Sequence, residues 1–193
     1  PTCAGKSQLA NIISKIIDGK IINADSMQVY KNVEVLTDQP KITKHHYLYN
    51  HININQKYSV KLWLSEIIPL LQSINTTNQY AILVGGTGLY FQSLLKGLCF
   101  VPKITLHDKN LVNDYVKRTK GNEFDILRKI DPKLSSILNP KDNFRIRRGL
   151  EVILSTGKSL LIWWKNTHKY LSAEQIFNIY IKSDRHYLYE KIN

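Results

Sequence analysis

Apolar residues recur at helical spacing in the first part of the chain. The positions i, i+3, i+4, i+7 and i+8 are occupied by Leu9, Ile12, Ile13, Ile16 and Ile17. This spacing predicts an amphipathic helix that follows a loop of small residues and ends before Gly19. A short apolar run at Lys20–Ala24 then predicts a strand, with Asp25 and Ser26 at its carboxyl end.

A continuous apolar run occurs at Tyr80–Val84. It lacks polar alternation, which is typical of a strand buried on both faces of a parallel sheet. Gly85-Gly-Thr-Gly88 follows and leads into a helix through Leu95. Residues 58–73 also have helical spacing, and we expect a break or kink at Pro69. Strand, turn and helix recur, so the pattern predicts an α/β core.

The pattern changes after Pro102 to charged amphipathic helices. We expect them at about 107–119, 122–130 and 142–155, with prolines between them. Near the end, residues 175–181 alternate β-branched and aromatic side chains and predict a strand, and Asp184 caps a last helix. The charged stretch therefore predicts an inserted helical lobe.

Composition places the chain among folded, non-membrane proteins. It has 193 residues, of which 43% are hydrophobic and 22% charged, so it can bury a core. No apolar run approaches the roughly 20 residues of a spanning helix. Cys3 and Cys99 lie far apart without metal-ligand spacing, and no signal segment precedes Cys3. We expect a cytoplasmic protein.

The charge is strongly basic, with 27 Lys and Arg against 15 Asp and Glu. Residues 103–169 hold 15 of these basic side chains and 7 of the acidic ones, and they include the cluster Arg145, Arg147 and Arg148. Such a surplus favours a nucleic-acid surface, because cations that neutralise phosphates supply sequence-independent affinity. A lysine-rich composition that only decorates a solvated face would explain lysines, but not this arginine cluster.

Gly5-Lys6-Ser7 has the end of the G-x-x-x-x-G-K-[ST] phosphate-binding loop, placed where the first helix begins. Backbone N–H groups would cradle a phosphate chain, Lys6 would neutralise it, and the Ser7 hydroxyl would reach Mg²⁺. A plain helix start is the alternative interpretation. We predict a P-loop NTPase-like parallel sheet core over 1–102 and 150–193, flanked by helices, with the helical lobe over 103–149.

The acidic residues argue against simple ATP hydrolysis. A hydrolytic P-loop protein has a second apolar strand that ends in a metal-holding Asp, whereas Ala81–Val84 ends in glycines. Asp25 is the nearest carboxylate at a strand end. It can serve as a metal partner or a general base, or it can simply cap the next turn.

Several motifs follow one another along the whole chain: Pro1-Thr2, Gly5-Lys6-Ser7, Asn23-Ala-Asp-Ser-Met-Gln-Val-Tyr30, His45-His46, Tyr58-Ser59-Val60, Val84-Gly-Gly-Thr-Gly-Leu-Tyr90, Asp131-Pro132, Asn139-Pro140-Lys-Asp142, Arg145-Ile-Arg-Arg148, Leu150-Glu-Val152, Thr156-Gly-Lys158 and Asp184-Arg185. In these motifs and in their order the chain resembles the tRNA dimethylallyltransferase, or tRNA isopentenyltransferase, family. The family is longer, so the resemblance implies a member truncated at both ends.

The resemblance implies a prenyl transfer. The family moves a dimethylallyl group from dimethylallyl diphosphate to N6 of adenosine 37, beside the anticodon, in tRNAs that read codons beginning with U. By this resemblance Asp25, Thr2 and Lys6 are catalytic, and Ser7 holds Mg²⁺. Diphosphate binding falls to Thr2, Cys3, Ala4, Gly5, Lys6, Ser7 and Arg185. Binding of the tRNA anticodon stem-loop falls to Asp25, Ser26, Met27, Gln28, Thr87, Lys109, Phe144, Arg145, Ile146, Arg147 and Arg148.

The chain departs from the family pattern at several positions. The usual Gly-Thr-Ala-Lys-Pro is Leu36-Thr-Asp-Gln-Pro40 here, and Gly149 replaces an alanine of a helical Arg-Ala-Leu-Glu motif. Two other functions stay open beside prenyl transfer. One is an inactive fragment that keeps RNA binding, and the other is a small-molecule kinase that uses the same phosphate-binding loop. We expect a monomer with no membrane partner.

Overall fold

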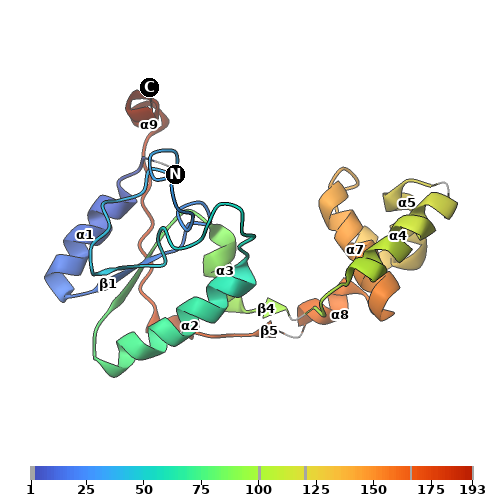
Figure 1. Cartoon of the computed structure of the whole chain (residues 1–193), viewed down its shortest axis with the longest axis horizontal. Coiled ribbons are helices and arrows are strands. Elements are labelled where there is room, and N and C mark those ends of the chain that lie inside the picture. Colours follow the sequence, from blue (N-terminus) through green and yellow to red (C-terminus); the bar gives the residue numbers. More distant parts are fainter. Residues whose placement is uncertain (1–2, 100, 120, 166, 193) are drawn as a thin grey trace. The chain divides into compact units, whose positions relative to one another are not determined.

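The computed structural model describes residues 3–99, 101–119, 121–165 and 167–192. The chain divides into two compact units (Figure 1). Pro1–Gly97 with Lys169–Asn193 forms the first, the α/β unit, and Leu98–His168 forms the second, the helical unit. In the described residues no helix is long and apolar enough to cross a bilayer.

The α/β unit is built on a three-stranded parallel sheet. β1 (Lys20–Asn23) lies between β2 (His46–Tyr47) and β3 (Ala81–Val84), so the strand order is β2-β1-β3. Ile21 pairs with Ile82 and Ile22 with Leu83. The helices are α1 (Lys6–Ile17), α2 (Val60–Thr76), α3 (Gly88–Lys96) and α9 (Arg185–Ile192). The predicted parallel α/β core is confirmed.

The core of this unit follows the sequence pattern only in part, because Ile12 and Ile16 of the expected apolar face of α1 are 57% and 75% exposed. Ile22, Trp63 and Ile67 are fully buried, and Ala10 of α1 packs with Ile21 and Val84. A break or kink is expected at Pro69, and the structure excludes the break, because α2 continues through this residue to Thr76. The Trp63 ring stacks on Tyr90 with centroids 4.4 Å apart, which joins α2 to α3.

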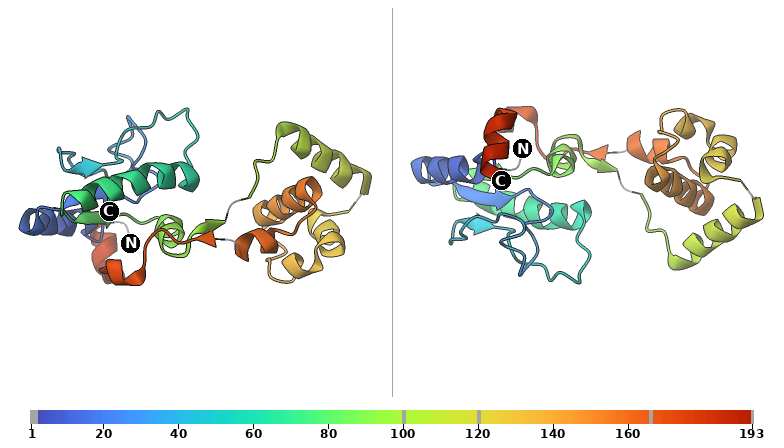
Figure 2. Two further views of the ribbon diagram at one scale, coloured as in Figure 1. Left: turned by 90° about the horizontal axis from the view of Figure 1, so that it is seen from below. Right: turned by 90° about the horizontal axis from the view of Figure 1, so that it is seen from above.

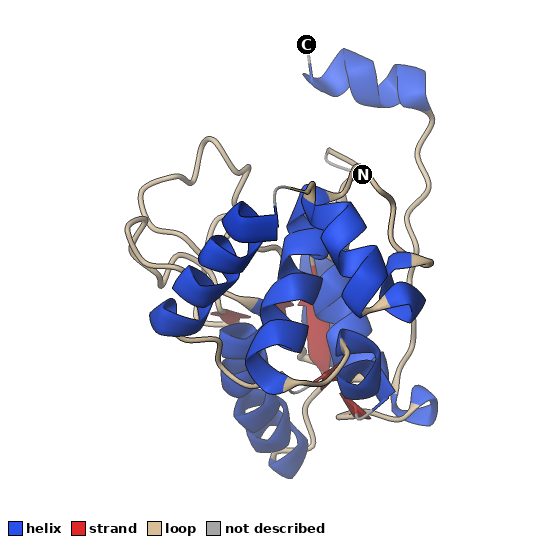
Figure 3. Ribbon diagram, turned by 90° about the vertical axis from the view of Figure 1, so that its right-hand side faces the viewer, coloured by secondary structure: helices blue, strands red, loops and turns tan. Residues whose placement is uncertain are grey.

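The strand predicted at 175–181 is absent. Ala173–Gln175 forms the 3-10 helix η1, and residues 176–184 follow as extended backbone without a strand partner, drawn as loop in Figure 3. Phe177 and Tyr180 are 89% and 85% exposed. Alternation gives a segment the shape of a strand, but a strand also requires a neighbour for its N–H and C=O groups. Asp184 does cap α9, where its carboxylate accepts from the His186 N–H.

The helical unit begins and ends on a small antiparallel pair, β4 (Leu98–Cys99) and β5 (Thr167–His168). Between them lie α4 (Leu106–Thr119), α5 (Glu123–Ile130), α6 (Pro132–Ser135), α7 (Asn143–Thr156) and α8 (Leu160–Lys165). Figure 2 shows α7, in orange, between α4 and the α5–α6 segment. The three long helices expected from the sequence are therefore present within one residue of their predicted ends.

Residues 150–168 were assigned to the α/β core, and they lie in the helical unit instead. The reason is that α7 continues past residue 150 without a break and Leu150, Val152 and Leu160 are buried in one cluster with Ile126, Leu127 and Leu134. A Cβ on Gly149 would lie 2.7 Å from a Leu134 methyl carbon. The glycine therefore allows α7 to approach its neighbours closely, which explains why it can replace alanine.

Candidate active site

The phosphate-binding loop lies at the start of α1. Gly5 caps the helix with φ of +80°, a left-handed conformation that glycine adopts without strain, and its carbonyl accepts from the Leu9 N–H at 3.0 Å. Cys3 also has a positive φ, of 58°. No acidic residue lies in the first turn of α1, so the partial positive charge of the helix N-terminus is not neutralised by its own side chains.

A cavity of about 490 Å³ opens beside this loop, within the size range of sites for small ligands. It brings together the phosphate-binding loop, the end of β1, the end of β3 and a segment near residue 40. Its lining consists of Cys3, Ala4, Gly5, Lys6, Ser7, Gln8, Asn11, Asp25, Gln28, Thr37, Asp38, Gln39, Pro40, Lys41, Val84 and Gly85.

Asp25 is held in place at the end of β1 by a buried asparagine. The Asn23 side chain is fully buried, and its Oδ1 accepts from the Asp25 N–H at 2.8 Å. Its Nδ2 donates to the carbonyls of Asp25 and Leu48, at 2.9 and 3.0 Å. One Asp25 oxygen, Oδ1, accepts from the Met27 N–H at 2.9 Å. These contacts fix the orientation of the carboxylate, which is the requirement for a positioned base.

The glycine-rich turn after β3 packs directly on the Asp25 turn. A Cβ on Gly85 would lie 2.1 Å from the Ala24 carbonyl carbon and oxygen, and one on Gly86 would lie 3.5 Å from Asp25 Oδ2. Thr87 joins the same contact, because its Oγ1 accepts from the Ser26 N–H at 2.9 Å. Gly85 is therefore required by backbone contact, and the turn leaves room beside the second carboxylate oxygen.

Two tyrosines near Asp25 are held in the neutral form. Burial, followed by the charges of Tyr30 and Asp25, raises the pKa of Tyr90 to about 12. Burial raises the pKa of Tyr49 above its usual range, and the charge of Asp25 raises it further. Both hydroxyls remain protonated near neutral pH, so neither acts as a base in place of the carboxylate.

The α/β unit brings together most of the site residues expected in it. Cys3, Ala4, Gly5, Lys6, Ser7, Asp25 and Gln28 line one cavity, and Ser26 and Thr87 contact each other next to Asp25. Met27 is 57% exposed and does not line the cavity. Thr2 lies outside the described residues, and of Arg185 the structure describes the backbone at the start of α9 but not the side chain.

The helical unit holds the other expected residues, which have unequal exposure. Phe144 is 86% exposed, the Arg145 side chain is 71% exposed, and Lys109 is exposed on α4. Ile146, expected among the tRNA contacts, is 1% exposed because it belongs to the core that α7 forms with its neighbours. Its side chain cannot contact a ligand without unfolding of that core.

All three arginines form ion pairs within the unit. Arg147 donates to Glu123 of α5 at 2.6 Å and to Asn113 of α4, and its Nε lies 4.0 Å from Glu151. Arg148 lies 3.4 Å from Glu151. The exposed Arg145 pairs with Asp142, the half-buried cap of its own helix, at 2.9 Å. The arginine cluster therefore combines one exposed cation with one that links three helices.

Sequence reasoning did not assign a role to Asn23 or Asn11, or to the loop at residues 37–41. Asn11 could have been found from helix periodicity, since it stands four residues after Ser7 and therefore on the same face of α1. The loop stands out in the sequence only as a departure from the family motif at residues 36–40, and its place at the cavity is given by the folded chain.

The chain matches a known protein family and several of its members. The family described as IPP transferase matches residues 28–193. A tRNA dimethylallyltransferase of Pelagibacter ubique is 40% identical, in an alignment that covers 100% of this chain and 63% of the relative. One from Wolbachia pipientis is 37% identical, with 100% and 65% covered. The chain thus spans somewhat less than two thirds of the length of these two relatives.

Two solved structures are similar to this one. A eukaryotic dimethylallyltransferase acting on tRNA superposes with a TM-score of 0.71 at 26% identity, over 89% of this chain and 44% of that one. A full-length tRNA isopentenylpyrophosphate transferase of Bacillus halodurans gives 0.50 at 29% identity, over 82% and 54%. The similarity therefore extends from sequence to fold.

Proposed function

The chain belongs to the IPP transferase family, and from this premise we propose that it carries the catalytic core of a tRNA dimethylallyltransferase. The protein transfers a dimethylallyl group from dimethylallyl diphosphate to N6 of adenosine 37 in tRNAs that read codons beginning with U. The observation that carries the proposal is the shared cavity of the phosphate-binding loop and Asp25. A small-molecule kinase would leave the family match unexplained.

The residues of the cavity divide the reaction between them. The first turn of α1, with Lys6 and Ser7, binds the diphosphate and stabilises the negative charge that develops as it leaves. The adenine N6 attacks the first carbon of the dimethylallyl group, a C–N bond forms, and the C–O bond to the diphosphate breaks with its electron pair on oxygen. Asp25 accepts the N6 proton, so atoms and charge balance.

Mg²⁺ fits the oxygen donors of this cavity. The described residues contain no cluster of three or more His, Cys, Asp or Glu side chains, which suits an ion held by one or two protein oxygens together with substrate phosphates. Ser7 would hold the ion through its hydroxyl. When bound, Mg²⁺ supplies positive charge to the departing diphosphate.

The helical unit supplies the cationic surface for the anticodon stem-loop. Lys109, Phe144 and Arg145 are exposed on α4 and α7, where an aromatic ring and cations can contact bases and phosphates. The target amine is stacked in an ordered anticodon loop, so the adenine must be turned out of the stack to reach Asp25.

The decisive experiment uses the substitution Asp25→Asn. Asparagine keeps an oxygen that can accept from the Met27 N–H but cannot take the N6 proton. We expect transfer of a labelled dimethylallyl group to an anticodon stem-loop with adenosines at 36–38 to fall by at least about 100-fold, with stem-loop affinity unchanged. Asp38→Asn, which removes the other carboxylate of the cavity, is the matched comparison and should cost less than about tenfold. Near-normal turnover by Asp25→Asn would exclude it as the base.

A further inference from the structure

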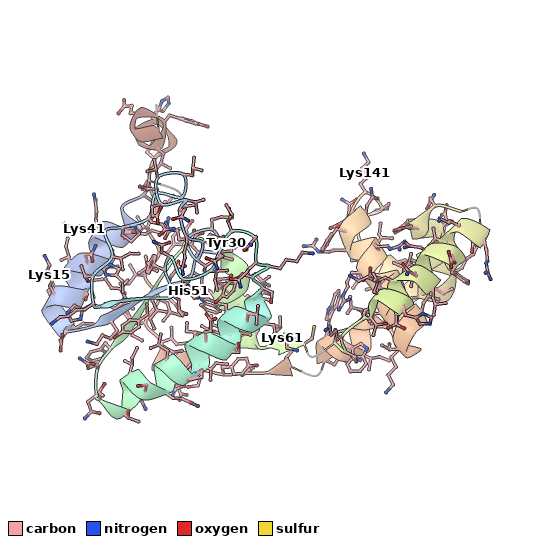
Figure 4. All side chains as sticks on the ribbon, viewed as in Figure 1. Lys15, Tyr30, Lys41, His51, Lys61 and Lys141 are labelled. Carbon is pink, nitrogen blue, oxygen red and sulfur yellow. The ribbon has the colours of Figure 1, made fainter. Side chains whose placement is uncertain are left out.

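A second stretch of the cavity lining comes from residues 37–41, here called the cavity loop. These residues stand outside the phosphate-binding motif. They overlap the segment 36–40, which differs from the family motif Gly-Thr-Ala-Lys-Pro. The loop carries the second lysine of the lining, Lys41, beside Lys6 of the phosphate-binding loop. Figure 4 shows Lys41 near α1.

The cavity loop is attached to the turn that carries Asp25. Gln28 Nε2 donates to the carbonyls of Thr37 and Asp38, at 2.8 and 3.1 Å, so both of its amide hydrogens are used. Gln39 Nε2 donates to the Tyr30 carbonyl at 3.1 Å. The segment 28–30 therefore holds the loop through three hydrogen bonds, and the position of the loop depends on Gln28 more than on any other side chain described here.

Lys41 is an unpaired cation of the cavity. It makes no hydrogen bond or ion pair with any residue that the structure describes, although it lines the same space as Asp25 and Asp38. In the family motif Gly-Thr-Ala-Lys-Pro the lysine corresponds to position 39. Here Gln39 is uncharged, and its amide donates to the Tyr30 carbonyl. A second positive charge is thus present in the cavity two residues later in the chain.

We propose that Lys41 is a second diphosphate-binding residue and that Gln28 is a positioning residue that holds the cavity loop over the diphosphate. The inference rests on the proposed function, because it takes the same cavity as the diphosphate site. Two lysine ammonium groups in one cavity, those of Lys6 and Lys41, neutralise more of the diphosphate charge than the phosphate-binding loop alone. Gln28 contributes to diphosphate binding through the loop that it holds.

The test measures binding of inorganic pyrophosphate with Mg²⁺ to the 193-residue chain by titration calorimetry, without tRNA. Lys41→Gln should weaken the affinity about tenfold, and Lys41→Arg should restore most of it. Lys44→Gln is the matched control, since Lys44 is an exposed lysine of the same segment that does not line the cavity, and it should change nothing.

Gln28→Ala should also weaken pyrophosphate binding, and less so when combined with Lys41→Gln than by itself, because both changes act through one loop. Additive effects would contradict the positioning role. If Lys6→Ala abolishes binding but Lys41→Gln matches its control, this inference fails and the proposed function stands. If Lys6→Ala changes nothing, or if the unsubstituted chain binds no pyrophosphate, both fail. A second titration, with an anticodon stem-loop in place of pyrophosphate, completes the test: if Lys41→Gln loses only stem-loop affinity, Lys41 binds RNA and the inference is overturned.

Discussion

Gly85 is the residue at which the two halves of the active site meet. Its Cα is so close to the backbone of Ala24 that no Cβ fits, since even the smallest side chain would overlap the peptide group before Asp25. Backbone cannot move away as the end of a flexible side chain can. The identity of this one residue therefore fixes the distance between the turn after β3 and the turn that carries Asp25.

We predict that Gly85→Ala lowers the free energy of unfolding by about 2–3 kcal/mol, as overpacking does in a tight site. Gly88 is the matched control, because nothing lies within 4 Å of its added Cβ and it begins α3. Gly88→Ala should leave stability unchanged or raise it by up to about 1 kcal/mol. Urea unfolding of both variants measures the difference, and equal midpoints would contradict the close contact.

For single residues, the sequence predicts which chemical role a side chain can have better than it predicts where that side chain lies in the fold. Gly5, Lys6 and Ser7 could be placed at a phosphate site because their spacing has a direct physical meaning, and Asp25 because it follows an apolar run. The sequence motif alone did not show that Ile146 is buried while its neighbours Phe144 and Arg145 are exposed. The motif lies on one helix, and its residues are divided between the exposed and the buried face of that helix. One of the three side-chain hydrogen bonds of Asn23 goes to the Leu48 carbonyl, which is distant in sequence.

α7 is the element whose two faces have different tasks. Phe144 and Arg145 point outward at its first turn, while Ile146, Gly149 and Leu150 are buried. Arg147 extends from the same helix to Glu123 of α5 and Asn113 of α4. Arg147 therefore helps to fix the helix that carries Arg145, the cation that we propose contacts RNA.

Substitutions in this cluster should separate the two tasks. Arg147→Ala should destabilise the helical unit by about 1 kcal/mol, a value kept low because the side chain is 24% exposed. Arg145→Ala should change stability by less than about 0.5 kcal/mol, but weaken stem-loop binding and reduce its salt slope by about one. Thermal melts and salt titrations measure both effects. If only Arg147→Ala lowers the salt dependence of stem-loop binding, then Arg147 and not Arg145 contacts the RNA, and the two roles are exchanged.

Elements were predictable where local pattern suffices. α1, α4, α5 and α7 have strong periodicity and occur where expected, and α5 and α7 also have side-chain N-caps, Asn122 and Asp142. β2 has two residues, too few for any pattern, and exists because β1 offers it hydrogen bonds. The segment at 175–181 shows the opposite case, in which a good pattern lacks a partner. Tertiary context decided both outcomes.

Among the residues that the structure describes, each of the two units holds a hydrophobic core of its own. One surrounds the parallel sheet, and the other lies between α4, α5, α6, α7 and α8. The boundary predicted at residue 150 was wrong because a charge map follows the surface, whereas a unit is defined by what its helices bury. The sequence shows where the α/β pattern gives way to helices after Pro102, but it does not show where the helical unit ends and the α/β unit resumes.

Each core should therefore unfold in its own transition. Leu150→Ala, at a fully buried position of the helical unit, should cost about 2–5 kcal/mol and lower the melting temperature of that unit, leaving pyrophosphate binding by the α/β unit in place. Ile67 of α2 is equally buried, and Ile67→Ala should lower the melting temperature of the α/β unit and leave that of the helical unit unchanged. Calorimetry distinguishes the cases, since a single transition lowered by both variants would mean that the chain unfolds cooperatively.

The unpaired segment before α9 has a consequence for the behaviour of many copies together. Residues 176–181 contain no charge, proline or glycine, and three of their large side chains, Phe177, Ile179 and Tyr180, are more than half exposed. Short segments of this composition stack with identical copies into cross-β aggregates. The net charge of +12 keeps the chains apart while salt is low. Concentrated, salt-rich solutions should therefore aggregate through this segment first.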